Sequence, residues 1–165
     1  MKSKLVLGAV LFLIGCIAPT ICIVKRIQFN QQCSGYLKQA ADAITVETAL
    51  ERVNLALDYM EAHSLTDGYT SVIYKTEDEN IGFWYNNIKS CRSDLEGCIG
   101  GSQLEKTNTL MKLRETLTDN GESGIVLTIP EGIWKFPYNT LWAILNVISV
   151  LLMCPLVWWL IVAFA

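Results

Sequence analysis

The chain has 165 residues, of which 52% are hydrophobic and 18% charged, and its formal net charge is −3. A typical soluble domain has about 25% charged residues, so this composition disfavours an ordinary soluble protein. Nucleic-acid binding is disfavoured too, because it requires clustered Lys and Arg. Residues 25–137 instead carry 11 Lys and Arg against 16 Asp and Glu, a net charge of −5.

Two long apolar runs account for the low charge. They are Leu5–Val24 and Leu141–Ala165. A helix crosses a hydrocarbon core of roughly 30 Å with about 20 residues, so each run is long enough to span a membrane. The predicted organisation is a short tail at residues 1–4, transmembrane helices at 5–24 and 138–165, and one domain at 25–137.

The first run has other interpretations. Residues 13–16, Leu-Ile-Gly-Cys, resemble the lipobox of bacterial lipoproteins, which implies acylation at Cys16 after cleavage. A charged start followed by an apolar stretch is also typical of a cleaved signal peptide. The apolar run continues to Val24 and ends at Lys25 and Arg26, which favours an uncleaved helix. The lipoprotein and cleaved-signal interpretations remain alternatives.

The second run has aromatic residues at both ends, which is typical of a membrane span. They are Trp134, Phe136, Tyr138 and Trp142 at its start, and Trp158, Trp159 and Phe164 near its end. Asn146 lies one or two turns inside this run. A lone amide at such a depth bonds either a backbone carbonyl or a neighbouring helix. Asn146 is therefore either a tolerated polar residue or a candidate membrane helix contact.

Two spans place both termini on one side of the membrane. Lys25, Arg26 and Lys135 flank the middle domain, and Lys2 and Lys4 flank the tail. The count alone favours a cytoplasmic domain, but long connections translocate largely regardless of charge. The signal-like first run favours an N-terminus inside. We therefore expect a plasma or inner membrane protein with an extracytoplasmic domain.

The middle domain is predicted to be a small helical bundle. Thr76 and Glu79 have capping-box spacing, and an apolar stripe with helical periodicity follows. The stripe comprises Ile81, Trp84, Ile88, Cys91, Leu95 and Cys98. Ser102 and Glu105 predict a second capping box for a helix that ends near Leu117.

The remaining segments predict two more helices and some extended chain. Helices are expected near Phe29–Ile44 and Glu47–Ala62, with a bend near Thr45, a weak helix former. Tyr69–Tyr74 and Ile125–Ile129 are short β-prone stretches that either pair as a minor hairpin or serve as extended connections. The fold class is thus mainly α, with two transmembrane helices flanking the bundle.

Three cysteines lie in the domain, namely Cys33, Cys91 and Cys98. An unbroken helix would place Cys91 and Cys98 about 10.5 Å apart, too far for a disulfide. Unwinding near Gly97 would let them pair, and this pair is the leading disulfide candidate. A bond from Cys33 to either residue, or no disulfide, are the alternatives. None of the spacings is the Cys-x-x-Cys of redox or zinc sites.

Other polar residues have structural explanations. His63, the single histidine, lies near a predicted helix C-terminus, where a cation is favoured. The acidic residues 77–79 and Asp67 lack the alternating ligands of a calcium loop, so we interpret residues 77–79 as a solvated helix start. No catalytic group, metal ligand set or cofactor site is predicted.

Aromatic residues provide the candidate binding site. Phe83, Trp84 and Tyr85 are consecutive, and Tyr69 and Tyr74 lie in a nearby segment. Three consecutive helical residues cannot all face one core. Since Trp84 belongs to the apolar stripe, Phe83 or Tyr85 must point elsewhere. These five residues either pack together or form a partner- or ligand-binding surface, since aromatic residues are enriched at interaction hot spots.

We therefore predict a non-enzymatic membrane protein whose domain acts as an interaction module or accessory subunit. The expected partners are the lipid bilayer and another membrane protein or a second copy of the chain. One alternative is a small-ligand sensor, since the arrangement is similar to that of chemoreceptor ectodomains, although no motif of that family matches. A membrane-anchored lipoprotein is the second alternative.

Overall fold

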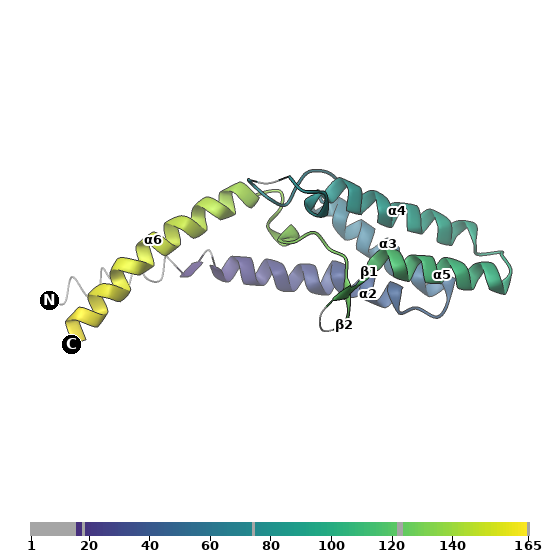
Figure 1. Cartoon of the computed structure of the whole chain (residues 1–165), viewed down its shortest axis with the longest axis horizontal. Helices are drawn as coiled ribbons and strands as arrows, with labels where there is room; N and C mark the ends of the chain where they lie inside the picture. The colour runs from purple at the N-terminus through teal and green to yellow at the C-terminus, as the bar shows by residue number, and fades with distance from the viewer. Residues whose placement is uncertain (1–15, 18, 74, 122–123, 165) are drawn as a thin grey trace.

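The computed structural model describes residues 16–17, 19–73, 75–121 and 124–164, with the side chains of residues 152–164 excepted. Over these residues the fold is mainly helical, as predicted, and it includes one small two-stranded sheet (Figure 1). The helices are α2 (Gly35–Ala41), α3 (Val46–Ala62), α4 (Ile81–Gly97), α5 (Gln103–Leu117) and α6 (Asn139–Phe164). The shorter elements are η1 (Asn30–Ser34), η2 (Glu77–Glu79), η3 (Ile133–Lys135), β1 (Thr118–Gly121) and β2 (Gly124–Leu127).

The chain is helical without interruption from residue 19 to residue 41. An α-helical segment at residues 19–29, the N-terminal helix, continues through the π-helical η1 into α2. The predicted bend near Thr45 is confirmed. Thr45 is extended, and its hydroxyl accepts a hydrogen bond from the backbone N–H of Thr48 at 3.3 Å, so it caps α3.

Helix α4 begins later than the capping box suggests. Thr76 and Glu79 do form the box, but it opens only the single turn η2. Asn80 is extended and caps α4, because its side-chain oxygen accepts the N–H of Phe83 at 3.0 Å. The box at Ser102 opens α5 as predicted, and the Ser102 N–H donates to Glu105 at 2.6 Å.

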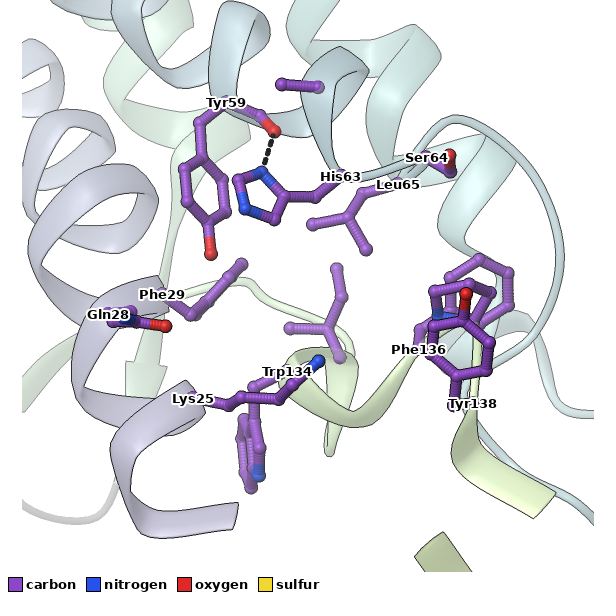
Figure 2. Close-up of a pocket in the computed structure, with 13 residues that line it drawn as sticks. Lys25, Gln28, Phe29, Tyr59, His63, Ser64, Leu65, Trp134, Phe136 and Tyr138 are labelled. Atoms are coloured by element: carbon purple, nitrogen blue, oxygen red, sulfur yellow. Dashed lines mark hydrogen bonds between the residues drawn. The ribbon is translucent and has the colours of Figure 1, made fainter. Parts of the chain in front are cut away.

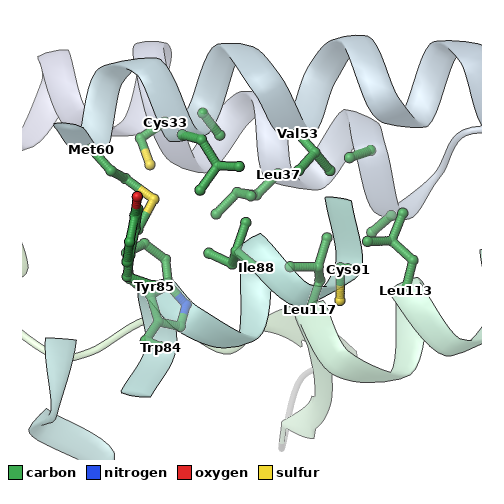
Figure 3. Close-up of a cluster of buried hydrophobic side chains, with 14 of the residues drawn as sticks. Cys33, Leu37, Val53, Met60, Trp84, Tyr85, Ile88, Cys91, Leu113 and Leu117 are labelled. Carbon is green, nitrogen blue, oxygen red and sulfur yellow. The ribbon is translucent and has the colours of Figure 1, made fainter. Parts of the chain in front are cut away.

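The predicted stripe of α4 is confirmed as part of the hydrophobic core, which α2, α3 and α5 complete (Figure 3). The α4 residues Ile81, Trp84, Ile88, Cys91 and Leu95 are all buried. They meet a larger apolar set from the other helices. Its buried members include Leu37, Val46, Ala49, Val53, Ala56, Leu57, Met60, Leu113 and Leu117.

The β-prone stretches do not pair with each other. Ile125 pairs with Asn120 in an antiparallel hairpin, while Tyr69 forms only an isolated bridge with Asn80. The physical reason is proximity in sequence. Two residues separate β1 from β2, so closing that loop costs little conformational entropy.

The N-terminal helix and α6 leave the bundle on the same side (Figure 1). Both carry exposed apolar side chains. These are Ile21, Ile23, Val24 and Ile27 on the N-terminal helix, and Leu141, Ile144, Val147, Ile148, Val150 and Leu151 on α6. Within the described part of the chain, no helix is both long enough and apolar enough to cross a membrane. Most of the first predicted span, Leu5–Val24, lies outside the described residues.

The core predicts a sharp contrast between two substitutions in α4. Ile88 is 1% exposed, so Ile88→Ala should lower the free energy of unfolding by about 2–5 kcal/mol through lost burial and a cavity. Phe83 is 64% exposed, and Phe83→Ala should change the free energy of unfolding by no more than about 0.5 kcal/mol. Chemical denaturation monitored by circular dichroism measures both. Equal losses would contradict the assignment of the core.

Candidate functional site

The side chains of the three consecutive aromatic residues in α4 lie in three different environments. The indole N–H of Trp84 donates to the carbonyl of Thr128 at 2.7 Å, and both Trp84 and Tyr85 are buried. The hydroxyl of Tyr85 donates to a carboxylate oxygen of Glu61 on α3 at 2.7 Å. Phe83 alone points to solvent. The prediction that Phe83 or Tyr85 must leave the core is confirmed for Phe83.

The tyrosines of the preceding segment do not join this triplet. Tyr69 is half-buried, and its ring lies 5.5 Å from the ammonium of Lys75. Its backbone carbonyl accepts a hydrogen bond from the Asn139 amide at 3.1 Å, at the start of α6. Tyr74 lies outside the described residues. Of the five predicted aromatic residues, Phe83 and Trp84 line one groove, and Tyr69 and Tyr85 do not.

This groove, the acidic groove, runs between α4 and the segment that follows β2. Its volume is about 450 Å³. The residues that line it are Glu77, Asp78, Asn80, Phe83, Trp84, Asn87, Ile88, Thr116, Leu117, Asp119, Val126, Leu127, Thr128, Ile129 and Pro130. Three of them are carboxylates, and none is Lys or Arg. Phe83 and Val126 add exposed apolar surface to this negative rim.

A second hollow, the basal cavity, lies where the N-terminal helix and α6 meet the bundle (Figure 2). Its volume is about 300 Å³. The lining residues are Lys25, Gln28, Phe29, Tyr59, Ala62, His63, Ser64, Leu65, Ile133, Trp134, Phe136, Pro137 and Tyr138. No carboxylate is among them, although the domain as a whole is acidic.

Cations and aromatic rings meet at this base. The Lys25 ammonium lies 6.0 Å from the ring centre of Tyr138 and 5.9 Å from that of Trp142. The Arg26 guanidinium lies 4.9 Å from the ring centre of Trp134. These cation–π contacts join the N-terminal helix to the segment that leads into α6.

The segment leading into α6 is also tied to the loop after α3. The Asn139 amide bridges the carbonyls of Tyr69 and Thr70, at 3.1 and 2.9 Å. The Phe136 ring packs against Gly68, where a Cβ would lie 2.7 Å from a ring carbon. Gly68 also has φ of +110°, which disfavours any L side chain. This position therefore requires glycine.

The C-terminus of α3 supplies the upper edge of the basal cavity. His63 ends α3, and its Nδ1 donates to the Tyr59 carbonyl at 2.9 Å, which confirms the predicted capping role. The imidazole also stacks on the Tyr59 ring at 4.0 Å between centres. Burial raises the pKa of Tyr59, with a further contribution from nearby Cys33, so its phenol stays protonated.

The predicted disulfide between Cys91 and Cys98 is wrong. Both residues are buried free thiols, and so is Cys33. Helix α4 continues without unwinding to Gly97, so the two Cα atoms remain about two turns apart. Burial raises the pKa of Cys91 and raises that of Cys33 to about 12. Since the thiolate is the reactive form, these side chains act as core hydrophobes.

Asn146 bonds within its own helix, because its amide donates to the Trp142 carbonyl at 2.7 Å. This geometry favours the interpretation as a tolerated polar residue. Among the described residues, no group of three His, Cys, Asp or Glu side chains lies close enough to hold a metal ion.

Sequence reasoning missed the basal cavity. Its residues come from three separate stretches, near positions 25, 60 and 135, and no spacing within one element links them. One signal was present: both predicted spans had basic or aromatic residues at their domain ends, and such residues favour one interface level. Comparisons with protein-family models, curated proteins and solved structures gave no match to this chain.

The loss of stability caused by removing the Tyr85 hydroxyl should depend on pH. The hydrogen bond to Glu61, followed by burial, raises the pKa of Tyr85 above its unfolded value of about 10. The resulting stabilisation is complete below about pH 10 and is lost as the pH rises through the folded-state pKa. Tyr85→Phe should therefore cost about 1 kcal/mol at pH 7, and the gap to the wild type should shrink above about pH 10. Urea unfolding at both pH values measures this. A gap that widens at high pH would contradict the assigned bond.

Proposed function

We propose that this chain is a two-pass integral membrane protein whose helical domain, residues 25–137, is a non-enzymatic interaction module or accessory subunit. The domain lies on the extracytoplasmic side of a plasma or inner membrane. Its acidic groove binds a segment of another membrane protein.

The observation that carries the membrane part is the exposed apolar surface on the N-terminal helix and α6. Contiguous apolar patches of this kind mark interaction with lipid or protein. The exposed apolar residues of α6, including Leu141, Ile144 and Val147, lie on one broad half of the helix, away from the buried Trp142 and Ser149, which suits contact with lipid on that half.

The base of the domain supports the same placement. Lys25, Arg26, Trp134, Tyr138 and Trp142 gather where both segments leave the bundle. Amphipathic aromatic rings and basic side chains favour the headgroup level of a membrane. This group of basic and aromatic residues would therefore lie at the boundary between the lipid and the domain.

The acidic groove supports the choice of partner. It combines the exposed ring of Phe83 and the exposed Val126 with carboxylates of Glu77, Asp78 and Asp119. Complementary charge steers association and selects partners. The matching segment is basic and apolar. A second copy of this acidic domain would bring like charge, so another protein suits the groove better.

Membrane insertion and orientation can be tested together. The full chain should stay in the membrane pellet after extraction with alkaline carbonate, because apolar spans resist that treatment. An Ile44→Cys variant, with Cys16, Cys22 and Cys154 replaced by Ala, should react with an impermeant maleimide in intact cells, since position 44 is 91% exposed.

The same chain without Ile44→Cys is the matched control. Its remaining cysteines are buried, so it should label slowly. Release of the protein by carbonate would contradict the spans. Labelling of position 44 only after permeabilisation would place the domain in the cytosol.

The partner surface can be tested with a photocrosslinker. Benzoyl-phenylalanine at position 83 should form one adduct in cells, and Asp78→Asn with Asp119→Asn should reduce its yield several-fold by removing charge from the groove. The matched control carries the crosslinker at Leu104, which is 70% exposed on α5 and outside the groove. Equal adducts at both positions, or a yield independent of the carboxylates, would contradict the proposal.

A small-ligand sensor is the second candidate. The groove volume of about 450 Å³ favours it, because ligand pockets commonly measure about 300–1,000 Å³. The crosslinking experiment separates the two functions. A small ligand in the groove leaves the crosslinker at position 83 without a protein adduct.

A further inference from the structure

The basal cavity is a polar hollow whose charge is opposite to that of the acidic groove. We propose that it binds the phosphate of an anionic phospholipid headgroup. The inference rests on the membrane placement proposed above, because only that placement brings the cavity to headgroup level.

The first argument is charge. Lys25 lines the cavity, and no Asp or Glu does. In the described part of the chain, Lys25 makes no ion pair, and its ammonium lies by the rings of Tyr138 and Trp142 rather than by a carboxylate. Figure 2 shows the Lys25 side chain reaching from the N-terminal helix across the cavity. A bound anion would supply the negatively charged partner that the Lys25 ammonium lacks.

The second argument is the set of hydrogen-bond donors in the cavity wall. Gln28, Tyr59 and Ser64 line the same cavity and bring an amide and two hydroxyl groups. Phosphate oxygens accept such bonds, and those to the ammonium are the strongest because they are charge-assisted. Aromatic and apolar residues, including Trp134 and Tyr138, complete the wall and suit the glycerol backbone of a lipid.

The C-terminus of α3 at the cavity edge needs explanation, because helix C-termini repel anions. Its last carbonyls are already engaged. The Tyr59 carbonyl accepts the Nδ1–H of His63, the Met60 carbonyl accepts the N–H of Leu65 at 2.8 Å, and that of Glu61 accepts the N–H of Ser64 at 3.2 Å. These bonds reduce the negative field at the edge.

The third argument is the backbone of Ser64. Its φ is +58°, the only positive φ at a described non-glycine residue. It follows the end of α3, at the position where glycine is usual. A non-glycine residue there is strained, and such strain clusters at functional sites. Ser64 lines the cavity, which gives a reason for serine at a position where glycine would fit more easily.

The experiment uses the full chain purified in dodecyl maltoside, an uncharged detergent. Dihexanoyl-phosphatidylglycerol, dihexanoyl-phosphatidylcholine and inorganic phosphate are titrated separately at constant ionic strength. Affinity and Tm are measured for each. We expect the phosphatidylglycerol to bind and to raise Tm, with little response to phosphatidylcholine.

Two variants connect binding to the cavity. Lys25→Gln should weaken binding of the phosphatidylglycerol at least tenfold. Ser64→Gly should raise Tm without lipid, because it relieves the positive φ, and should still weaken binding. The matched control is Lys135→Gln, which removes a nearby charge that does not line the cavity, and it should bind as the wild type does.

Each outcome decides the proposal. Binding of phosphatidylglycerol that depends on Lys25 but not on Lys135 supports it. Equal binding of inorganic phosphate with the same dependence supports a phosphate site whose source is soluble. No binding of any probe, or equal loss in both lysine variants, overturns it. Because the protein is in detergent, these results are independent of carbonate extraction, so failure of the site and failure of the membrane placement are distinguishable.

Discussion

Burial of the apolar stripe of α4 is the constraint on which the rest of the structure depends. The stripe fixes the rotation of α4 about its axis, and that rotation sets the environment of each neighbouring side chain. With Ile81 and Ile88 in the core, the side chain of Trp84 must also point into the core, and that of Phe83 must point to solvent. Trp84 then reaches the Thr128 carbonyl and holds the chain after β2 beside α4. The acidic groove exists because these two segments are fixed side by side while Phe83 remains outside.

The base of the domain depends on a different kind of interaction. Few apolar side chains hold α6 to the bundle, and polar contacts take their place. The Asn139 amide bonds two carbonyls of the loop after α3, and the Lys25 ammonium lies 6.0 and 5.9 Å from the ring centres of Tyr138 and Trp142. Because these contacts involve backbone carbonyls and rings, they leave the Lys25 charge without a carboxylate partner. The same arrangement that joins α6 to the N-terminal helix thus leaves a positive cavity.

The two hollows therefore differ in charge and in their position on the domain. The acidic groove carries Glu77, Asp78 and Asp119 beside exposed apolar residues, and the basal cavity carries Lys25 among donors and aromatic rings. An acidic domain is repelled by the anionic surface of a membrane unless cations lie at its base. On the membrane placement proposed above, this separation of charge would let the basal cavity meet lipid while the acidic groove meets a basic partner.

The sequence by itself determined the helical class, the α4 stripe, the break at Thr45 and the capping box that opens α5. These features are local, because helix periodicity and caps depend on residues within four positions of one another. Only the tertiary structure decided which β-prone segment pairs with β1, where Tyr85 finds Glu61, and that Cys91 and Cys98 stay apart. The basal cavity was likewise beyond the sequence, since Lys25, Ser64 and Tyr138 meet only after the helices pack. Local pattern fixes the elements, whereas contacts between distant residues depend on how those elements are placed in space.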